Sequence, residues 1–535
     1  MKSLNAEQQN WVDKTFSSLS LEQRVAQLLI PKVDAGSPVE VLTEYLQGKI
    51  EFGGLFVWGE KAEVHRERIG RLQKASRIPL VVAADLENGA GQTVFGTTQF
   101  PSMLALGAAG DEQLAYEMGK ASAIDGWSAG IHWTFAPVVD VNVNPDNPIA
   151  NHRCLGDDPD RISRLAKANI RGMQEHGLAA CAKHFPGDGI DDVDQHIATS
   201  ANSLSMERWK AISGRTFSAA FSAEVWSVMI GHIALPAWDP ERDKRGAYRP
   251  ATLSPRITTD LLRNEMQFKG LAVTDDMNMG GASGYANRKD RTVGCITAGC
   301  DMLLFPFLPQ DYETLLQAVR AGTLSEERVN EAARRVLEFK ARLNLHHERI
   351  RRDATADERA SFDRSAREIA GQSIVLVRNT DGLLPLRTLK PGARVLTVTL
   401  TNDRLDLPEI DQELAARGFK VEHVVPTSYG DVDPWVSKVD AIFVNFTFSA
   451  NWGMGSPRSV GPHNRSFMNG FYMEHPCVVF TSFGSPYHLR QFNTLPNYIN
   501  VHSFAPASQR AAVAAWFGEA PMTAKSPVGN LERKF

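Results

Sequence analysis

The sequence predicts an α/β protein in which a (β/α)₈ TIM-like barrel is followed by a smaller α/β sandwich. Eight short apolar runs rich in β-forming residues alternate with helical patterns over about the first 345 residues, and five more runs follow a charged stretch. A barrel of strand and helix units typically needs roughly 250 residues and grows by loop insertions. An open doubly wound sheet is the alternative for the first part of the chain.

Residues 1–345 are predicted to form the first domain, the catalytic barrel. A typical helix signal is SLEQRVAQLL, in which Ser20 and Gln23 have the spacing of a capping box. The apolar residues of this run recur at helical spacing and form one face. The eight predicted strands are 28–33, 54–58, 80–87, 133–141, 179–185, 226–233, 271–276 and 301–306.

The segment 346–372 is predicted to be a linker and connecting helix. Its first part, HHERIRRDATADERA, is charged and lacks apolar periodicity, which favours a solvated linker or an exposed helix. The second body, residues 373–535, is predicted to be the α/β sandwich, because its apolar runs are typical of buried strands. These runs are 373–379, 393–400, 441–448, 476–486 and 498–505.

Composition and charge narrow the possible function classes. With 43% hydrophobic and 22% charged residues the chain has the balance of a soluble globular protein, and its net charge of −4 is small for 535 residues. Because the sequence has no dense Lys/Arg run, neither nucleic acid nor a membrane surface is an expected partner. A small, neutral or mildly charged substrate fits better, and the oligomeric state stays open.

The first residues and the cysteines bear on the cellular compartment. The start, MKSLNAEQQNWVDKTF, has no apolar core before a cleavage site, and no window reaches the roughly eighteen apolar residues of a spanning helix. We therefore expect a cytoplasmic protein. The cysteines are scattered and form no C-x-x-C pair, which favours reduced, buried thiols over disulfides or zinc ligands. They are Cys154, Cys181, Cys295, Cys300 and Cys477.

Polar residues gather where the predicted strands end. In a barrel these ends share one face, and active sites are assembled there from the loops that follow the strands. Each residue alone is more typical of a helix cap or a loop carboxylate, but their repetition favours a common pocket. They are Asp85, Glu87, Asp140, Lys183, His184, His232, Asp275 and Asp276.

The stretch KHFPGDGIDDVDQH concentrates carboxylates and histidines at the end of the fifth predicted strand. A calcium loop fits poorly, because counting from Asp188 puts Thr199 where an EF-hand needs glutamate. Zinc binding by His184, Asp194 and His196 has no supporting spacing, so no metal is expected. A solvated acidic loop is the remaining non-catalytic interpretation.

Six motifs, in order along nearly the whole chain, resemble the two-domain members of glycoside hydrolase family 3, in the β-N-acetylglucosaminidase (β-N-acetylhexosaminidase) branch. Several long, ordered matches are far more specific than one short motif. The motifs are DLENGAGQTV, TQFPSMLALGAAGD, FAPVVDVNVNPDNPIANHRCLGDDPD, KHFPGDGIDDVDQH, VTDDMNMGG and SIVLVRNTDGLLPL.

The resemblance implies three catalytic residues. The nucleophile is the aspartate after Ser or Thr at the end of the seventh strand, here Asp275, and the acid/base dyad is Asp194 with His196. An imidazole titrates near roughly 6.5, so His196 can protonate a leaving oxygen and later deprotonate water. A carboxylate bonded to the other ring nitrogen fixes the tautomer and stabilises the imidazolium. The alternative for Asp275 is a helix cap.

The sequence departs from the branch pattern inside the loop that carries the dyad. Asp188 stands where the branch usually has His, Ile190–Asp191 replaces Asp-Thr, and Gln195 replaces Ser. The Asp-x-His spacing itself is kept. These changes bear on the conformation of the loop and on substrate preference.

For sugar binding the resemblance carries over Asp85, Arg153, Lys183 and His184. Charged donors and acceptors suit this task, because sugars are polar, uncharged and need several directional hydrogen bonds. Arg153 has an alternative, which is to bridge loop carboxylates such as Asp157 or Asp158. His232 is as typical of a core histidine as of a ligand. No cofactor is expected, because both chemical steps need only proton transfer and a nucleophile.

The resemblance implies a retaining glycoside hydrolase that removes terminal β-linked N-acetylglucosamine from small cell-wall or chitin-derived glycosides, through a glycosyl-Asp275 intermediate. Phosphorolysis is an alternative, because a neutral histidine does not repel phosphate as a carboxylate base would. A β-glucosidase or xylosidase of the family, with a glutamate acid/base from the second domain, is another. A non-catalytic sugar-binding barrel is the third.

Overall fold

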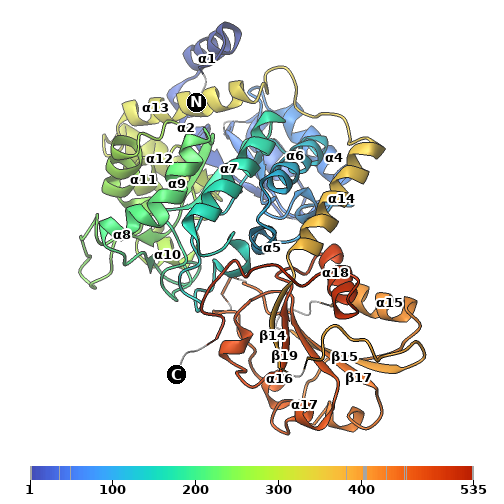
Figure 1. Cartoon of the computed structure of the whole chain (residues 1–535). Helices are drawn as coiled ribbons and strands as arrows, with labels where there is room; N and C mark the ends of the chain where they lie inside the picture. Colours follow the sequence, from blue (N-terminus) through green and yellow to red (C-terminus); the bar gives the residue numbers. More distant parts are fainter. Residues whose placement is uncertain are drawn as a thin grey trace.

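The computed structural model describes residues 3–34, 36–48, 50–380, 382–401, 406–428, 430–450, 452–453 and 455–532, and it has a mixed α/β fold with parallel sheets. The N-terminal part, drawn from blue to yellow, holds most of the helices, and the orange to red C-terminal part is built around one sheet (Figure 1). Helix α14 (Ala356–Gln372) joins the two. It packs on α5 (Met103–Ala109) and α6 (Glu112–Ser128) of the first part and on α18 (Pro506–Trp516) of the second.

Each of the eight strand runs predicted in the first part contains a strand, and nearly all of their residues are buried. Continuous burial of this kind is typical of parallel strands that are covered on both faces. The first run holds the two short strands β1 (Leu29–Ile30) and β2 (Lys32–Val33). The others are β3 (Gly54–Val57), β5 (Val81–Ala84), β7 (Trp133–Thr134), β8 (Cys181–Phe185), β10 (Ser227–Ile230), β12 (Leu271–Thr274) and β13 (Leu303–Leu304).

Parallel pairing arranges these strands in their order along the chain. One sheet has the order β2-β3-β5-β7, a second β12-β10-β8, and β1 pairs with β13. Single parallel bridges, Trp133 with Ala179 and Val273 with Met302, connect β7 to the start of β8 and β12 to β13. Because all these neighbours are parallel, the carboxyl ends of the strands face the same way. Residues that follow different strands therefore meet there.

The helices of the first part cover the strands, and one continuous hydrophobic core extends from Val25 to Ile369. At α2 (Leu21–Ala26) the predicted capping box is confirmed, since Ser20 and Gln23 exchange side-chain to amide hydrogen bonds. None of the described helices is long and apolar enough to span a membrane. Besides three short 3-10 helices, η1 (Ala90–Gln92), η2 (Asn151–Arg153) and η3 (Ala251–Leu253), the other described helices of the first part are α1 (Ala6–Ser18), α3 (Glu40–Gln47), α4 (Ala62–Ala75), α7 (Pro159–Glu175), α8 (Met206–Ala211), α9 (Ser213–Ser222), the π-helix η4 (Arg256–Glu265), α10 (Gly280–Ser283), α11 (Arg288–Ala298), α12 (Gln310–Arg320) and α13 (Glu326–Arg342).

The strands that the structure describes in the C-terminal part form one six-stranded sheet with the order β14-β19-β18-β17-β15-β16. Only the pairing of β14 with β19 is antiparallel. Helices α15 (Pro408–Ala416) and α18 supply apolar residues to the core on one face, and α17 (Phe471–Glu474) supplies residues to the core on the other. The strands are β14 (Val375–Asn379), β15 (Arg394–Leu400), β16 (Lys420–Val424), β17 (Ala441–Phe446), β18 (Val478–Ser482) and β19 (Asn497–Asn500).

The sequence did not predict strand β16. Its residues, KVEHV, are mostly polar, and none of them is fully buried because β16 lies at the edge of the sheet. An edge strand has only one neighbour and does not need the continuous apolar run that identifies the central strands. The five runs that were predicted for this part all contain strands.

All five cysteines are free thiols, as the sequence predicted. Cys477 is half-buried and the other four are buried. Burial raises the pKa of each thiol, so each is protonated near neutral pH. The cysteines therefore serve packing.

A buried ionic cluster centred on Asp301 fixes the residues that lead into β13. The carboxylate of Asp301 lies 2.7 Å from Arg263, 2.7 Å from Arg328 and 3.0 Å from Arg335, and it accepts the amide of Ala272 at 2.9 Å. Burial acts to raise the pKa of Asp301, but the three guanidinium groups outweigh it and lower the pKa to about 2. The side chain is thus ionised at neutral pH.

We expect Asp301→Asn to lower the free energy of unfolding by about 3–5 kcal/mol, because it leaves buried guanidinium charge without its partner. Chemical denaturation at pH 7 measures this loss. Since the folded pKa lies below the unfolded value of about 3.9, the contribution is present at neutral pH and is lost as the pH falls from about 4 toward 2. The exposed Asp260→Asn is the matched control, and equal stability of the two variants would contradict the prediction.

Candidate active site

A four-residue ionic cluster lies at the carboxyl ends of β5 and β8. The ammonium group of Lys183 lies 2.9 Å from Asp85 Oδ1 and 2.7 Å from Glu87 Oε1. Arg153 makes a two-pronged contact with Glu87, through Nε at 3.1 Å and Nη2 at 2.7 Å. The structure therefore brings together three of the four predicted sugar-binding residues, with Glu87 as the acid that links them.

The charges of this cluster stabilise one another in a buried place. Burial opposes ionisation of Glu87, but Arg153 and Lys183 outweigh it and lower its pKa. Burial likewise opposes the charge on Lys183 and Arg153, while the neighbouring carboxylates raise the pKa of both. The side chain of Asp85 is 30% exposed, against 6% for Glu87, so Asp85 is the carboxylate that a ligand can reach.

Arg153 pairs with neither Asp157 nor Asp158, the two loop carboxylates named as its alternative partners. Its described carboxylate partner is Glu87, 66 residues earlier in the chain. Asp158 instead caps α7 by accepting the amide of Asp160, and Asp157 accepts the amide of Gly529. Asp157 and Asp158 were expected partners because they are close to Arg153 in the sequence. The fold instead brings Glu87, just after β5, next to Arg153.

His184, the fourth predicted binding residue, is held by Asp140. The His184 Nδ1 lies 2.7 Å from Asp140 Oδ2, and the His184 amide donates to Oδ1 at 3.1 Å. Since a carboxylate accepts at Nδ1, that nitrogen carries a proton and Nε2 is the nitrogen left for other contacts. Asp140 also accepts the amide of Asp188 at 2.8 Å, so it ties β8 to the loop that follows. The sequence marked Asp140 only as a polar residue at a strand end.

Asp275 follows β12 directly. Its amide donates to the carbonyl of Ile230 at 2.9 Å, and its Oδ1 accepts the amide of Asp276 at 2.8 Å. Burial acts to raise the pKa of Asp275, but the imidazoles of His184, His232 and His196 outweigh it, and the net shift is downward. The carboxylate is therefore ionised near neutral pH, as a nucleophile must be.

The helix-cap alternative for Asp275 does not hold in the structure. The next helix, α10, begins at Gly280 with Met279 at its cap position. The carboxylate that supports the intervening turn belongs to Asp276, whose Oδ1 accepts the amide of Asn278 at 2.8 Å. Burial raises the pKa of Asp276, so the two adjacent acids have opposite shifts.

Asp194 and His196 form a hydrogen-bonded pair. His196 Nδ1 lies 2.7 Å from Asp194 Oδ1, and the His196 amide donates to the same oxygen at 2.8 Å. Burial acts to raise the pKa of Asp194, but hydrogen bonds from His196 and from the amide of Gly453 lower it on balance. The His196 side chain is 26% exposed, whereas Asp194 is 6% exposed. The pair therefore offers an accessible imidazole backed by an ionised carboxylate.

The loop that carries this pair is held in place by its unusual residues. Gln195 donates to Asp188 Oδ2 at 3.0 Å and accepts the amide of His232 at 3.0 Å. Asn147 donates to Asp188 Oδ1 at 2.8 Å. Asp188 and Gln195 are two of the departures from the branch pattern, and they bond to each other. Nothing in the sequence indicated that one change accompanies the other.

The same loop lies against the start of α10. The amides of Gly280 and Gly281 donate to the carbonyls of His196 at 2.7 Å and of Gln195 at 2.9 Å. A Cβ atom at position 280 would lie 2.0 Å from the carbonyl oxygen of Ile197, so only glycine fits there. These contacts connect the dyad loop to the segment that follows Asp275.

His232 is a core residue beside the site. Both of its ring nitrogens have partners, with Nδ1 at 2.9 Å from Thr252 Oγ1 and Nε2 at 2.8 Å from the carbonyl of Asp276. Burial lowers its pKa, so it is neutral near pH 7. Its contact with the Asp276 carbonyl orients the chain just after Asp275.

The described side chains that come close enough to share a metal ion lie apart from the candidate active site. Among the described residues, the His, Cys, Asp and Glu side chains that come close enough to share an ion are Glu7, His346 and His347. They lie on α1 and after α13, outside the group built from the strand ends.

The comparisons with known proteins agree with these motifs. The family model "Glycosyl hydrolase family 3 N terminal domain" matches residues 20–339. A protein of Cellulomonas fimi named beta-N-acetylglucosaminidase/beta-glucosidase is 32% identical over 97% of this chain and 95% of its own length. Beta-hexosaminidase A of Pseudoalteromonas piscicida is 30% identical over 59% of this chain and 56% of its own.

Solved structures match over the whole chain. A beta-glucoside phosphorylase superposes with a TM-score of 0.88 and 31% identity, covering 98% of this chain and 97% of the other. A glycoside hydrolase family 3 beta-N-acetylglucosaminidase from Paenibacillus sp. gives a TM-score of 0.83 over 97% of this chain and 100% of that one, at 24% identity. At that identity the second match shows a shared fold only.

Proposed function

The chain belongs to glycosyl hydrolase family 3 and is a glycoside hydrolase, and from this premise we propose that it removes terminal β-linked N-acetylglucosamine from small cell-wall or chitin-derived glycosides. The observation that carries the proposal is the Asp194–His196 pair, with Nδ1 to Oδ1 at 2.7 Å. The names of the relatives, beta-N-acetylglucosaminidase and beta-hexosaminidase, favour the same substrate class. Recycling of cell-wall glycosides in the cytoplasm is the proposed setting, and it rests on the sequence alone.

The proposed mechanism is a double displacement with retention. Asp275, ionised in its setting of imidazoles, attacks the anomeric carbon while His196 donates a proton to the leaving oxygen. Water then attacks the glycosyl-Asp275 ester, and His196 removes the proton of that water. Asp194 keeps the proton of the ring on Nδ1, so that Nε2 is the nitrogen that exchanges protons with substrate and water.

Four residues are proposed to bind the sugar. Asp85 accepts hydrogen bonds from its hydroxyls, since it is the exposed carboxylate of its cluster. Lys183 and Arg153 donate from positions fixed by Glu87, and His184 offers Nε2 because Asp140 holds its Nδ1. Preset groups of this kind lose little entropy when the ligand binds.

We also infer how the sheets assemble. The strands of the eight predicted runs in residues 1–345 close into a (β/α)₈ barrel, 346–372 is the linker and connecting helix, and 373–535 is the α/β sandwich domain. The parallel neighbour order and the pairing of β1 with β13 support the closure. The division is supported by the larger hydrophobic cores, because one extends as far as Ile369 in α14 and the two others begin at Ile374 and Leu396.

Phosphorolysis is the second candidate function, since a beta-glucoside phosphorylase matches the whole chain at 31% identity. Phosphate would replace water in the second step. A neutral imidazole base at position 196 does not repel an approaching phosphate, whereas a carboxylate base would repel it. The same residues therefore serve either acceptor.

A panel of nitrophenyl glycosides, each incubated with and without inorganic phosphate, tests these proposals. We expect the fastest release of nitrophenol from the N-acetyl-β-glucosaminide, with free sugar as the product in the absence of phosphate. Formation of sugar 1-phosphate would select phosphorolysis, and turnover of β-glucoside or β-xyloside alone would overturn the proposed sugar. No turnover of any glycoside would favour a non-catalytic sugar-binding protein.

A further inference from the structure

Two consecutive residues of the C-terminal sheet domain lie against the dyad. The amide of Gly453 donates to Asp194 Oδ2 at 2.8 Å, and the ring of Trp452 lies 6.4 Å from the ring of His196. Since Oδ1 of Asp194 holds His196, both carboxylate oxygens are occupied, one by the acid/base and one by the second domain. Gly453 has φ of +75°, a conformation that favours glycine, and this directs its amide at Asp194.

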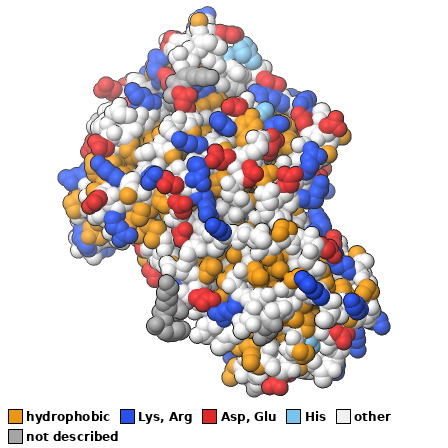
Figure 2. Space-filling model, viewed as in Figure 1, with side chains coloured by type: hydrophobic (Ala, Val, Ile, Leu, Met, Phe, Trp, Pro, Cys, Tyr) orange, Lys and Arg blue, Asp and Glu red, His pale blue; other side chains and the backbone are white. Residues whose placement is uncertain are grey.

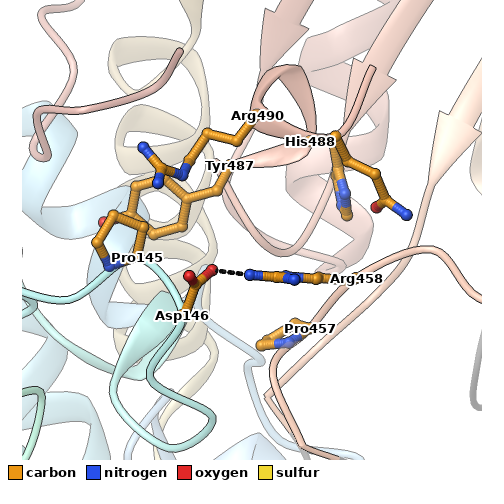
Figure 3. Close-up of a pocket in the computed structure, with 8 residues that line it drawn as sticks. Pro145, Asp146, Pro457, Arg458, Tyr487, His488 and Arg490 are labelled. Carbon is orange, nitrogen blue, oxygen red and sulfur yellow. Dashed lines mark hydrogen bonds and ion pairs between the residues drawn. The ribbon is translucent and has the colours of Figure 1, made fainter. Parts of the chain in front are cut away.

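The segment that carries these residues is attached to the barrel a few residues later. The hydroxyl of Ser456 donates to the carbonyl of Asp146, and Arg458 forms an ion pair with the Asp146 carboxylate. Figure 3 shows Asp146 and Arg458 facing each other between ribbons of the two domains. Pro145, Tyr487 and Arg490 line the same cavity of about 230 Å³.

Asp146 is also next to a residue that holds the dyad loop. Asn147 donates to Asp188 Oδ1 and to the carbonyl of Asp191, both at 2.8 Å. In the barrel loop at 146–147, Asp146 therefore contacts the second domain, and Asn147 binds the loop that carries Asp194 and His196. Arg458 is thus connected to the loop of Asp194 by two contacts. Arg458 pairs with Asp146, and the adjacent Asn147 binds Asp188 of that loop.

We propose that the C-terminal domain completes the acid/base dyad, with Gly453 as a positioning residue for Asp194 and the Arg458–Asp146 ion pair as the anchor that holds Gly453 there. This inference rests on the proposed function of the Asp194–His196 pair. A carboxylate with only one fixed oxygen can rotate away from the imidazole, whereas two fixed oxygens keep it in line. The second domain thus acts on proton transfer through Asp194.

The anchor suits a test by mutation because it contributes little to global stability. Arg458 is 46% exposed and Asp146 is 34% exposed, and ion pairs with this much contact with solvent are weak. Trp452 is 73% exposed, so burial does not account for its place beside His196. Figure 2 shows charged side chains of both signs dispersed over one face of the molecule.

Arg458→Gln and Asp146→Asn should each lower kcat/KM at least about tenfold on an unactivated N-acetylglucosaminide, and less than about twofold on a nitrophenyl one. The difference arises because only the poor leaving group needs the proton from His196. General-acid catalysis of this kind raises the rate by roughly 10²–10⁴-fold. Arg458→Lys keeps the charge and should retain most of the rate. Gly453→Ala, which disfavours a φ of +75°, should show the same selective loss.

Asp157→Asn is the matched control, since it removes the charge from another contact between the domains, in which Asp157 Oδ2 accepts the Gly529 amide at 2.6 Å, and it leaves Gly453, Ser456 and Arg458 unchanged. It should leave both rates unchanged, and circular dichroism should show every variant folded. Equal losses on the two substrates, or no loss in Arg458→Gln and Gly453→Ala, would overturn the inference. If the wild type itself turns over no N-acetylglucosaminide, then the proposed function fails, and this outcome is distinct from a failure of the inference about the second domain.

Discussion

Asp275→Asn is expected to abolish turnover of every glycoside while the protein stays folded. An amide cannot attack the anomeric carbon, and loss of a nucleophile costs on the order of 10⁴–10⁶-fold in kcat. The fold should survive, because burial already opposes the charge of Asp275 and asparagine has the same size. Measurement of kcat/KM on a nitrophenyl N-acetylglucosaminide, with circular dichroism of the purified variant, checks this.

Asp276→Asn is the matched control for this variant. It makes the same change one residue later, at a carboxylate that accepts the Asn278 amide in the turn after β12. We expect a loss of less than about tenfold, since the change removes only a charge from a turn hydrogen bond. Near-normal hydrolysis by folded Asp275→Asn, or equal losses in the two variants, would remove Asp275 from the mechanism.

Sequence patterns identified residues of the candidate site most readily where each residue follows directly from its own strand. Asp85, Lys183 and Asp275 were located because each stands at the carboxyl end of an apolar run, and those ends meet in a parallel arrangement. The Asp194–His196 pair spans two residues, so its geometry is local and its spacing is readable. Patterns of this kind depend on short-range chain geometry.

What the sequence could not predict depends on contacts between distant parts. Arg153 pairs with Glu87 across 66 residues, and Gly453 reaches Asp194 across 259. No periodicity or spacing encodes such a partner, because it arises only when separate elements pack. The Gln195–Asp188 bond has the same character, since each residue alone is only a departure from a motif. Strand β16 was missed because an edge position relaxes the apolar pattern.

The Asp194–His196 pair is expected to act as one unit in proton transfer. His196→Ala should lower kcat/KM by roughly 10²–10⁴-fold on an unactivated N-acetylglucosaminide and much less on a nitrophenyl one, because a good leaving group departs without a proton. Asp194→Asn should also lower the rate on the unactivated substrate, since an amide favours the wrong tautomer and does not stabilise the imidazolium. Steady-state kinetics on both substrates, with circular dichroism of each variant, measures these effects.

The double variant Asp194→Ala/His196→Ala tests whether Asp194 acts only through His196 or also has an independent role. If Asp194 works only by orienting and charging the ring, then its loss costs nothing more once the ring is gone, and the double variant should be scarcely slower than His196→Ala. The 2.7 Å contact between Nδ1 and Oδ1 is the geometric reason to expect this. The Gly453 amide on the other oxygen is the competing reason, because Asp194 also binds the C-terminal part of the chain. Losses that multiply in the double variant would assign Asp194 an independent role in ordering the loop and would break the proposed dyad.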